Sequence, residues 1–464
     1  MKLNNLMNCD YDIEISGIST DSRFTKKGDL FFAVNGFNVD HFDFIDQAIQ
    51  NGAVAIVSDR KYSDEIINIV TDDIDGLLVE VLNKFYDISD ISLIGITGTD
   101  GKTTTSSVIY QILSPYINNA YLGTNGLDIK NKHYNTSNTT PCVDELYKCL
   151  NLVKNNKCSH VVMEVSSEAL LHKRVDSLKF KIVCFTNITE DHLNVHKTLD
   201  NYINCKRHLL DLLNDDGFAI VNGDDKNCKS ILHNNLITFG FDDDNDYVIY
   251  NVNSSRKFVN FSVKCVNSNI DICSPLTGTY NVYNVTMAYI VCHLLKLSDK
   301  QIIDGIRNLK PISGRREFLN FGQDYDIVLD YAHTLNGIKS LVNSFNDKNQ
   351  LIVVTGAAGG REVSKREKIG KFLLENTFKV IFTMDDPRFE DPKKIVNDMI
   401  GNCKNTNYEI IIDREKAINY ALSNAKENNI ILIIGKGRDN YMAIENNKIK
   451  YCDYDVIANY FNHK

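Results

Sequence analysis

Residues 91–107 (ISLIGITGTDGKTTTSS) carry the residue types and the spacing that phosphate binding requires. Gly98 and Gly101 allow a tight turn in which backbone N–H groups approach an anion closely. Lys102 would reach the β- and γ-phosphates of a nucleotide, and the Thr103 hydroxyl would be a ligand of Mg²⁺. A helix that begins here would add the favourable field of its N-terminus. The segment therefore predicts a loop that binds the phosphates of ATP.

The match to the P-loop pattern GxxxxGK[ST] is incomplete, because Ile96 stands at the position of its first glycine. A plain strand-to-helix turn is the alternative interpretation. The Gly-Lys-Thr-Thr sequence shortly after an apolar run favours the phosphate loop. The residues predicted to contact ATP here are Gly98, Thr99, Asp100, Gly101, Lys102, Thr103 and Thr104.

A second group of candidate residues lies at the ends of two other apolar runs. Glu164 comes near the end of the run HVVMEV, and Asp191 and His192 follow the run IVCFTN. Open α/β sheets bind their ligands at the carboxyl ends of the strands. A carboxylate and an imidazole there could complete the coordination of Mg²⁺ around phosphates. Taken alone, such residues are more often structural; beside a phosphate loop, we interpret them as functional.

The elements that must position these residues follow an α/β pattern. Continuous apolar, β-branched runs alternate with helical stretches from about residue 90, as expected of a mainly parallel sheet covered on both faces. The strands expected from these runs are 29–34, 53–57, 93–97, 160–165, 182–187, 218–221, 327–331, 351–355, 379–383 and 430–434, with a helix at 42–50. Pro-Ile-Ser-Gly at 311–314 marks a break. We predict three α/β domains: 1–87, 88–312 and 313–464.

Composition and charge exclude several classes of protein. The 464 residues are 43% hydrophobic and 24% charged, with a net charge of −9. The acidic balance and the lack of a long basic run argue against nucleic acid or an anionic membrane as a partner, but not against an anionic small molecule. The 12 cysteines form no CxxC pair, which argues against a zinc site or a disulfide framework. Without a signal peptide or a long apolar segment, we expect a cytoplasmic monomer.

A series of motifs resembles one known family across most of the chain. The motifs are GITGTDGKTTT, EVSSEAL, FTNITEDHLNVH, CKRHLL, TGTYNVYN, SGRREF, DYAH, DDPRFEDP and GKGRDNY. They are similar to those of the Mur ligases, and within them to the MurE branch, the UDP-N-acetylmuramoyl-tripeptide synthetases. Residues 19–57 resemble the UDP-sugar-binding domain of that branch. The resemblance implies that 88–312 is a P-loop-type ATP-binding domain and that 313–464 is a Rossmann-like domain for the amino acid.

The resemblance also implies a reaction. ATP would phosphorylate the carboxylate of UDP-MurNAc-L-Ala-D-Glu, where MurNAc is N-acetylmuramoyl, and the amine of an amino acid would attack the acyl phosphate. A carboxylate is a poor electrophile because its leaving group would be oxide, whereas an acyl phosphate carries a good one. Transfer of a phosphoryl group to an anion requires strong charge neutralisation, so catalysis should depend on positioning and electrostatics.

Roles follow where motifs match residue by residue. The implied catalytic residues are Lys102, Glu164, His192 and Lys206. Glu164 and His192 would join Thr103 as metal ligands, and Lys206 aligns with the lysine that this family carbamylates to N6-carboxylysine. Without the resemblance, Lys206 would be interpreted as a solvated helix residue. Its carbamate is an anion that could hold a second Mg²⁺.

Further residues are implied to bind the two large substrates. Those for ATP are Asn281, Asn284, Arg315 (phosphate) and Asp330 (ribose). Contacts with ATP from the third domain would require domain closure. Those for the UDP-MurNAc-dipeptide are Thr20, Ser22, Asn138, Thr139, Thr140, Ser166 and Arg174.

The incoming amine is less clear, because two motifs depart from the usual pattern. Members that add meso-diaminopimelate have Asp-Asn-Pro-Arg where this chain has Asp-Asp-Pro-Arg, and GKGRD replaces GKGHE. Arg388 and Arg366 could bind a distal carboxylate. Asp386 disfavours one unless another cation compensates, and it would suit the ammonium of lysine or ornithine. We expect a diamino acid, with diaminopimelate slightly favoured over L-lysine. The residues implied to bind it are Arg366, Asp385, Asp386, Pro387, Arg388, Gly435 and Asp439.

Other departures leave two alternatives open. Asp100 replaces the usual Asn, Glu168 replaces His or Gln, and 37–39 (Phe-Asn-Val) replaces His-Gln-Ala of the uracil-side loop. They suggest either a divergent branch or a paralogue that acts on a modified acceptor. A second possibility for the function is a ligase for another acceptor, as in folylpolyglutamate or polyglutamate-capsule synthesis. A non-catalytic nucleotide-binding protein is the third possibility. The resemblance of 19–57 and the retained catalytic set favour the wall-precursor ligase.

Overall fold

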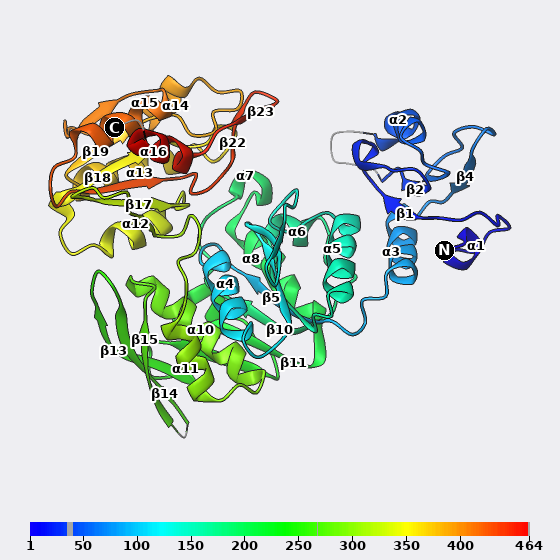
Figure 1. Cartoon of the computed structure of the whole chain (residues 1–464), viewed down its shortest axis with the longest axis horizontal. Coiled ribbons are helices and arrows are strands. Elements are labelled where there is room, and N and C mark those ends of the chain that lie inside the picture. Colours follow the sequence, from blue (N-terminus) through cyan, green and yellow to red (C-terminus); the bar gives the residue numbers. More distant parts are fainter. Residues whose placement is uncertain (35–39, 267, 463–464) are drawn as a thin grey trace. The chain divides into compact units, whose positions relative to one another are not determined.

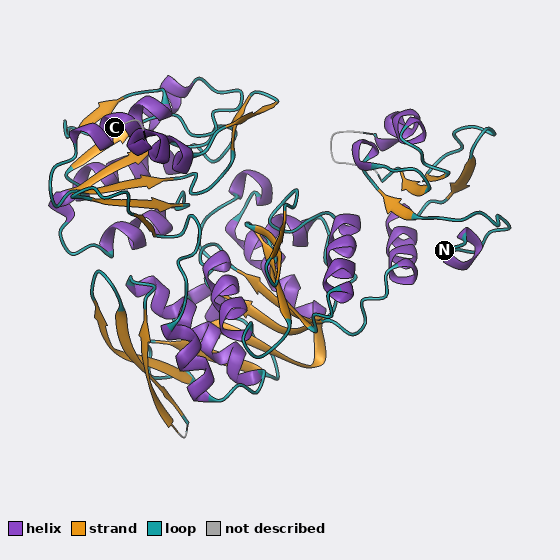
Figure 2. Ribbon diagram, viewed as in Figure 1, coloured by secondary structure: helices purple, strands orange, loops and turns teal. Residues whose placement is uncertain are grey.

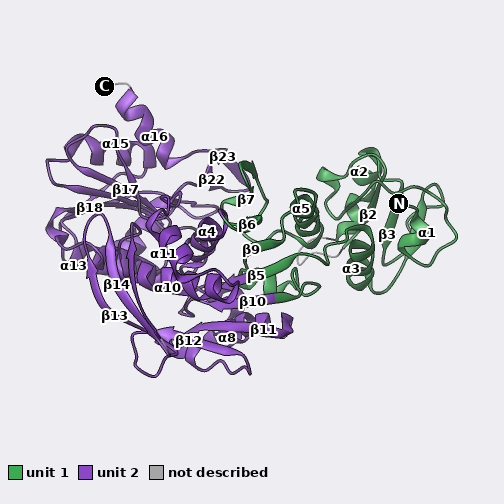
Figure 3. Ribbon diagram, turned by 60° about the horizontal axis from the view of Figure 1, so that its bottom comes forward, with its two compact units in different colours: residues 1–94, 116–180 green, residues 95–115, 181–464 purple. Residues whose placement is uncertain are grey.

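The computed structural model describes residues 1–34, 40–266 and 268–462, so the departure at 37–39 lies outside the described residues. The chain divides into two compact units, residues 1–94 with 116–180 and residues 95–115 with 181–464 (Figure 3). None of the helices in the described ranges combines the length and the apolar character that a membrane crossing requires. The α/β fold class is confirmed. The domain boundaries at 88 and 313 stay a prediction.

The first unit begins with a small parallel sheet. Its elements up to residue 94 are α1 (Leu3–Leu6), β1 (Gly17–Ser19), η1 (Ser22–Phe24), β2 (Asp29–Phe32), η2 (His41–Phe44), α2 (Ile45–Gln50), β3 (Ala55–Ser58), β4 (Ile67–Val70) and α3 (Ile74–Phe85). The strand order is β1-β2-β3-β4, with Leu30 opposite Ala55. Ile45 and Ala48 of α2 pack on Phe31 and Ile56. The two predicted strands and the predicted helix of this region are confirmed.

The remainder of the first unit carries the strand that ends at Glu164. Its elements are β6 (Asn119–Gly123), β7 (Gly126–Ile129), β8 (Lys132–Tyr134), α5 (Val143–Asn155), β9 (His160–Glu164) and α6 (Ser167–Leu171). The strand order is β9-β6-β7-β8, parallel between β9 and β6 and antiparallel beyond.

The second unit contains the phosphate loop and a mixed sheet. Its elements before residue 313, with β5 at the division between the units, are β5 (Ser92–Thr97), α4 (Lys102–Leu113), β10 (Phe180–Phe185), α7 (Leu193–His196), α8 (Leu199–Arg207), η3 (His208–Leu212), β11 (Leu213–Asn222), α9 (Lys226–Lys229), β12 (Leu236–Gly240), β13 (Tyr247–Ser254), β14 (Val259–Cys265), β15 (Ser268–Ser274), α10 (Thr279–Leu294) and α11 (Asp299–Arg307). The strand order is β15-β14-β13-β12-β11-β10-β5. The β11, β12 and β13 strands are parallel, and β14 and β15 continue the sheet antiparallel. Helix α10 packs on α4 (Figure 1).

A second sheet of this unit is covered by helices on both faces (Figure 2). Its elements are β16 (Glu317–Leu319), β17 (Asp326–Asp330), α12 (Leu335–Asn343), η4 (Lys348–Gln350), β18 (Leu351–Thr355), α13 (Ser364–Asn376), β19 (Lys379–Phe382), α14 (Pro392–Ile400), β20 (Tyr408–Ile410), α15 (Arg414–Asn424), β21 (Ile430–Ile434), β22 (Tyr441–Ile444), β23 (Asn447–Lys450) and α16 (Asp453–Asn462). The order is β16-β17-β21-β18-β19-β20, parallel except for β16.

Alternate residues of these strands face opposite helix layers. Val353 and Leu432 pack against α12, α13 and α14, whereas Ile352 and Ile431 pack against α15 and α16. Side chains alternate between the faces of a strand, so a sheet buried on both faces needs uninterrupted apolar strands. This burial explains the continuous runs seen in the sequence.

Candidate active site

The phosphate loop connects β5 to α4, as predicted. Gly101 precedes the helix in a left-handed conformation, with φ of 85°. A Cβ at this position would lie 2.6 Å from Asn284 Oδ1. Glycine is therefore required both by the turn and by the close approach of α10.

The loop is held by the segment that follows β10. The Thr99 and Asp100 N–H groups donate to the carbonyl and side-chain oxygens of Asn187 (2.8 and 3.0 Å), and Thr186 Oγ1 donates to the Asp100 carbonyl (2.6 Å). Thr99 Oγ1 lies 3.1 Å from Tyr202 Oη. The backbone of the loop is thus fixed by neighbours more than 80 residues away in the sequence.

Two lysines converge on the same carbonyl group. The Nζ atoms of Lys102 and Lys206 both donate to the Gly98 oxygen, each at 2.8 Å. Lys206 is 1% exposed, and its Nζ lies 4.7 Å from the ring centre of Tyr202. Burial lowers the pKa of Lys206, and the nearby charge of Lys102 lowers it further. A neutral amine is the form that adds to CO₂; the carbamate that the family resemblance implied stays a prediction.

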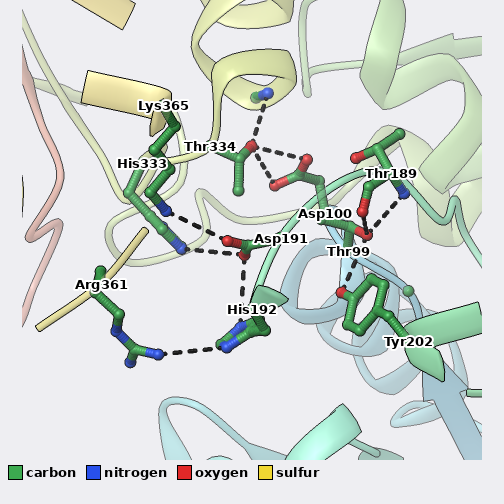
Figure 4. A network of polar contacts seen from close by, with 12 residues as sticks. Thr99, Asp100, Thr189, Asp191, His192, Tyr202, His333, Thr334, Arg361 and Lys365 are labelled. Carbon is green, nitrogen blue, oxygen red and sulfur yellow. Dashed lines mark hydrogen bonds and ion pairs between the residues drawn. The ribbon is translucent and has the colours of Figure 1, made fainter. Parts of the chain in front are cut away.

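His192 precedes α7 with a positive φ of 56°. Burial lowers the pKa of His192 to about 3, although the Asp191 carboxylate opposes the shift. The imidazole is therefore neutral near pH 7, as a metal ligand must be. Arg361 NH1 lies 3.3 Å from His192 Nδ1 (Figure 4).

Within the second unit, residues from the region after 313 reach the phosphate loop. Lys365 Nζ lies 3.3 Å from Asp191 Oδ1, and His333 Nε2 lies 3.9 Å from Asp191 Oδ2 (Figure 4). Arg315 NH2 donates to Thr103 Oγ1 at 2.8 Å. The structure thus brings the predicted phosphate residue Arg315 to the predicted metal ligand Thr103.

The other predicted ATP residues are also placed around this loop or next to Arg315. Asn284 Nδ2 donates to Asn281 Oδ1 (3.0 Å), and Asn284 Oδ1 accepts from Thr105 on α4 (3.2 Å). Asp330 accepts the N–H groups of Arg316 and Ala332, each at 2.7 Å. Burial raises the pKa of Asp330, against the effect of Arg315. Their contacts with ATP stay a prediction.

In the first unit, Glu164 is fully buried and its two oxygens are held by hydrogen bonds. Tyr121 Oη (2.6 Å) and the Thr124 N–H (3.0 Å) donate to Oε1, and Thr124 Oγ1 (3.1 Å) donates to Oε2. Thr139 Oγ1 lies 3.2 Å from Thr124 Oγ1. A Cβ on Gly123 would lie 2.2 Å from Glu164 Oε1, so a larger residue here would require this carboxylate to shift.

Three residues predicted to bind the sugar-peptide are brought together beside Glu164. Thr140 Oγ1 donates to the Glu164 carbonyl (2.9 Å) and accepts from the Ser166 N–H (3.0 Å). Arg174 NH1 donates to the Thr140 carbonyl (3.1 Å).

The remaining predicted contacts of this substrate are placed apart from that group. Asn138 is exposed, and its Nδ2 donates to Ser137 Oγ (3.2 Å). Thr20 Oγ1 donates to Asp144 (2.9 Å), and Ser22 Oγ is buried and donates to Gln47 (2.6 Å). The Ser22 hydroxyl is thus already used as a donor, while its oxygen can still accept a hydrogen bond from the substrate.

The predicted amine site is built around a lysine that the sequence reasoning missed. Lys436 is 1% exposed, and its Nζ lies 2.8 Å from Asp386 Oδ1, 3.7 Å from Asp439 and 4.0 Å from Asp385. Burial opposes protonation of Lys436, but the carboxylates of Asp385 and Asp386 outweigh it and raise its pKa. Burial raises the pKa of Asp439 to about 6. These four residues are called the Lys436 cluster below.

The backbone around the Lys436 cluster is tightly constrained. A Cβ on Gly435, where φ is 108°, would lie 2.4 Å from Asp385 Oδ2. Arg388 has a positive φ of 52°, and its N–H donates to the carbonyl of Ala443 in β22. Pro387 accepts the Glu390 N–H (3.0 Å).

Arg366, the other arginine proposed for a distal carboxylate, has partners within the protein. It is 1% exposed, and its guanidinium binds Glu390 and Asp398 at 2.8–2.9 Å. These partners balance its charge. Binding of the amine substrate by Arg366 stays a prediction, and the contacts of Arg366 with Glu390 and Asp398 do not support it.

The donor chemistry also limits how Mg²⁺ could be bound. Among the described residues, no three His, Cys, Asp or Glu side chains form a group that could hold a metal ion. Mg²⁺ prefers oxygen ligands and keeps several from water or phosphate. The Thr103 hydroxyl and a carbamate on Lys206 would supply oxygen ligands for Mg²⁺ that these side chains do not.

Three family models match successive parts of the chain. They are the Mur ligase family, catalytic domain (residues 14–90), the Mur ligase middle domain (96–292) and the Mur ligase, glutamate ligase domain (314–437). A UDP-N-acetylmuramoyl-L-alanyl-D-glutamate--2,6-diaminopimelate ligase from Bacillus licheniformis is 33% identical over 459 residues, covering 96% of this chain and 94% of the relative. The chain belongs to the Mur ligase family. It is accordingly an ATP-dependent ligase.

Other members of the Mur ligase family agree in sequence and fold. A Clostridium botulinum ligase with the same name is 34% identical over 459 residues, covering 96% of this chain and 94% of the relative. The solved structure of a ligase with this name is 26% identical, covers 100% of this chain and 99% of its own, and has a TM-score of 0.66. The MurF ligase from Thermotoga maritima in complex with ADP shares the fold, at 18% identity, 90% and 93% coverage and a TM-score of 0.68.

Several site residues were missed by sequence reasoning. Lys436 lies inside the GKGRD motif and Asn187 inside FTNITEDH, so their motifs could have identified both as candidate site residues. Lys365 and Arg361 had no signal in type or spacing, because only the tertiary structure brings them to Asp191 and His192.

Proposed function

We propose that this ligase joins a diamino acid to the D-Glu carboxylate of UDP-MurNAc-L-Ala-D-Glu, a step of peptidoglycan precursor synthesis. The observation that carries the proposal is 33% identity over nearly the full length to ligases named for this acceptor. The retained set Lys102, Glu164, His192 and Lys206 supports catalysis rather than nucleotide binding alone. We assign 1–87 to the UDP-sugar, 88–312 to ATP and 313–464 to the amino acid, in a cytoplasmic monomer.

The proposed reaction proceeds through an acyl phosphate. The carboxylate oxygen of the acceptor attacks the γ-phosphorus of ATP and ADP leaves; the amine then attacks the acyl carbon and phosphate leaves. Lys102 would leave the Gly98 carbonyl and bind the phosphates of ATP. Arg315 would likewise leave the Thr103 hydroxyl and bind a phosphate. Bound Mg²⁺ would neutralise phosphate charge, and the residues proposed to hold it are Thr103, Glu164, His192 and Lys206 as a carbamate.

For the acceptor, hydroxyls and one arginine suit recognition of diphosphate and carboxylate groups. Thr140, Ser166 and Arg174 are already connected by hydrogen bonds. Their clustering supports the assignment of the sugar-peptide to this part of the first unit.

For the amine, meso-diaminopimelate is favoured over L-lysine. The argument against a second carboxylate was the charge of Asp386, and Lys436 balances that charge at 2.8 Å. Arg388 adds a further cation in the same motif. L-Lysine stays the second candidate, because three carboxylates surround a single ammonium group in the Lys436 cluster.

Mass spectrometry of the product tests the proposal. The purified chain is incubated with ATP, Mg²⁺, UDP-MurNAc-L-Ala-D-Glu and equal amounts of meso-diaminopimelate, L-lysine and L-ornithine. We expect the diaminopimelate adduct to dominate. Lys102→Met should give no adduct, while Lys371→Met, at an exposed site on α13, should behave as wild type. Absence of every adduct despite ATP binding would refute the proposed pairing of this acceptor with a diamino acid, and a dominant lysine or ornithine adduct would refute the preferred amine.

A further inference from the structure

Asp100 is a carboxylate inside the phosphate loop, and its backbone is held on both sides. Its N–H donates to Asn187 Oδ1 (3.0 Å), and its carbonyl accepts from Thr186 Oγ1 (2.6 Å) and Asn187 Nδ2 (3.1 Å). The loop therefore fixes the direction in which the Asp100 side chain leaves the backbone.

That side chain meets the N-terminus of α12 (Figure 4). Thr334 Oγ1 lies 3.1 and 3.0 Å from the two carboxylate oxygens of Asp100. The same hydroxyl is the N-cap of α12 and accepts the Gly337 N–H at 2.9 Å. A Cβ on Gly337 would lie 3.2 Å from Asp100 Oδ1, so the carboxylate lies against the first turn. Thr334 is buried.

A negative charge in a loop that receives phosphates repels them unless it is neutralised. The N-terminus of α12 carries partial positive charge, and the Thr334 hydroxyl donates to the carboxylate. Both effects act only while α12 is seated on the loop. The charge of Asp100 should then oppose ATP binding when the helix is displaced.

We propose that Asp100 is a positioning residue that couples ATP binding to the seating of α12 on the phosphate loop. Thr334 holds the carboxylate on the helix, and ATP binds tightly only in that arrangement. The segment from Asp330 to Thr334 connects β17 to α12, so Thr334 lies four residues after the predicted ribose residue. The inference concerns ATP alone and is independent of the acceptor.

Calorimetric titration with Mg²⁺ and ATP tests the coupling. Thr334→Asp keeps a side chain that can cap α12. It removes the hydroxyl that donates to Asp100 and places a second negative charge beside that carboxylate. We expect the Kd for ATP to rise about tenfold, since a charge-assisted hydrogen bond is lost. In the Asp100→Asn background the same substitution should change Kd by less than about twofold, because the net charge of the contact then equals that of the wild type and the asparagine amide can donate to the new carboxylate.

Two controls separate this coupling from a general effect on helix α12. Ser298→Asp makes the same type of change at the N-cap of α11 and should leave Kd unchanged. Thr334→Ser keeps both hydrogen bonds and should bind ATP as wild type does. Equal losses in both backgrounds, or no loss at all, would overturn the proposal. If Thr334→Asp shows no cooperative unfolding, Thr334→Val is measured in both backgrounds against the same criterion.

Discussion

Two buried lysines of this ligase have opposite surroundings. Lys206 and Lys436 are each 1% exposed. Lys206 faces a carbonyl group, an aromatic ring and another lysine, and burial lowers its pKa. Lys436 faces three carboxylates, which raise its pKa despite burial. Burial acts in the same direction on both lysines, and the neighbouring carboxylates reverse its effect only at Lys436.

The difference in protonation separates the two lysines by role: Lys206 is suited to chemical reaction, and Lys436 to stabilising neighbouring carboxylates. A neutral amine at Lys206 can form a carbamate with CO₂, whereas an ammonium at Lys436 holds Asp385, Asp386 and Asp439 together. We expect substitution of Lys206 to affect turnover. Substitutions in the Lys436 cluster should affect stability and amine selectivity.

The largest effect is expected on stability at Lys436. Lys436→Met leaves one buried carboxylate (Asp385) and two partly buried ones (Asp386 and Asp439) without their shared cation, which should lower the free energy of unfolding by about 3 kcal/mol. Lys206→Met is the matched control, because it removes one neutral amine and should cost about 1 kcal/mol. Denaturant titration at pH 7 measures both. Similar losses at the two positions would contradict the contrast in charge.

Lys206→Ala should reduce turnover with ATP and acceptor by about 10²–10³-fold, the effect of losing one preorganised electrostatic group. Short carboxylates added to the assay should restore part of the activity, and removal of bicarbonate should slow the wild type. Lys206→Arg introduces a permanent cation and cannot form the carbamate, so its turnover should be as low as that of Lys206→Ala. Full activity of either variant would remove the carbamate from the mechanism.

Asp439 should make stability depend on pH. Its folded pKa of about 6 lies above the ordinary value, so the folded state retains the proton to higher pH. Its contribution to stability is complete below about pH 4 and falls by up to about 3 kcal/mol as the pH rises to 6. The free energy of unfolding of Asp439→Asn minus that of the wild type should therefore increase between about pH 4 and pH 6. Asp324→Asn, at an exposed site, is the control, and a flat difference for Asp439→Asn would contradict the raised pKa.

The smallest effect is expected on amine selectivity. Asp386→Asn keeps an acceptor for Lys436 and for the Ala443 N–H but removes one negative charge. The ratio of kcat/KM for diaminopimelate to that for lysine should rise about tenfold, because a like charge near the distal carboxylate is lost. Competition between the two amines measures this ratio. An unchanged ratio would place the distal end of the amine away from Asp386.

The phosphate loop could be predicted because its signal is contiguous. Gly98, Gly101, Lys102 and Thr103 lie within six residues, and the strand before them is apolar throughout. The Lys436 cluster was predicted only in part. Its acidic residues were named from motifs, but only the structure shows that Lys436, 50 residues from Asp386 in the chain, lies against that carboxylate. Contact of the cluster with the amine stays a prediction.

The sequence by itself determined the strand–loop–helix of the phosphate site, the uninterrupted apolar strands of a sheet covered on both faces, and the family. These features depend on local turn geometry and on side-chain alternation, which short segments encode. Only the tertiary structure decided that Lys206 is driven toward its neutral form, that Lys436 balances Asp386, and that Asp100 meets the N-cap of α12. Charge states and such contacts depend on distances between segments far apart in the chain, and those distances are set by packing.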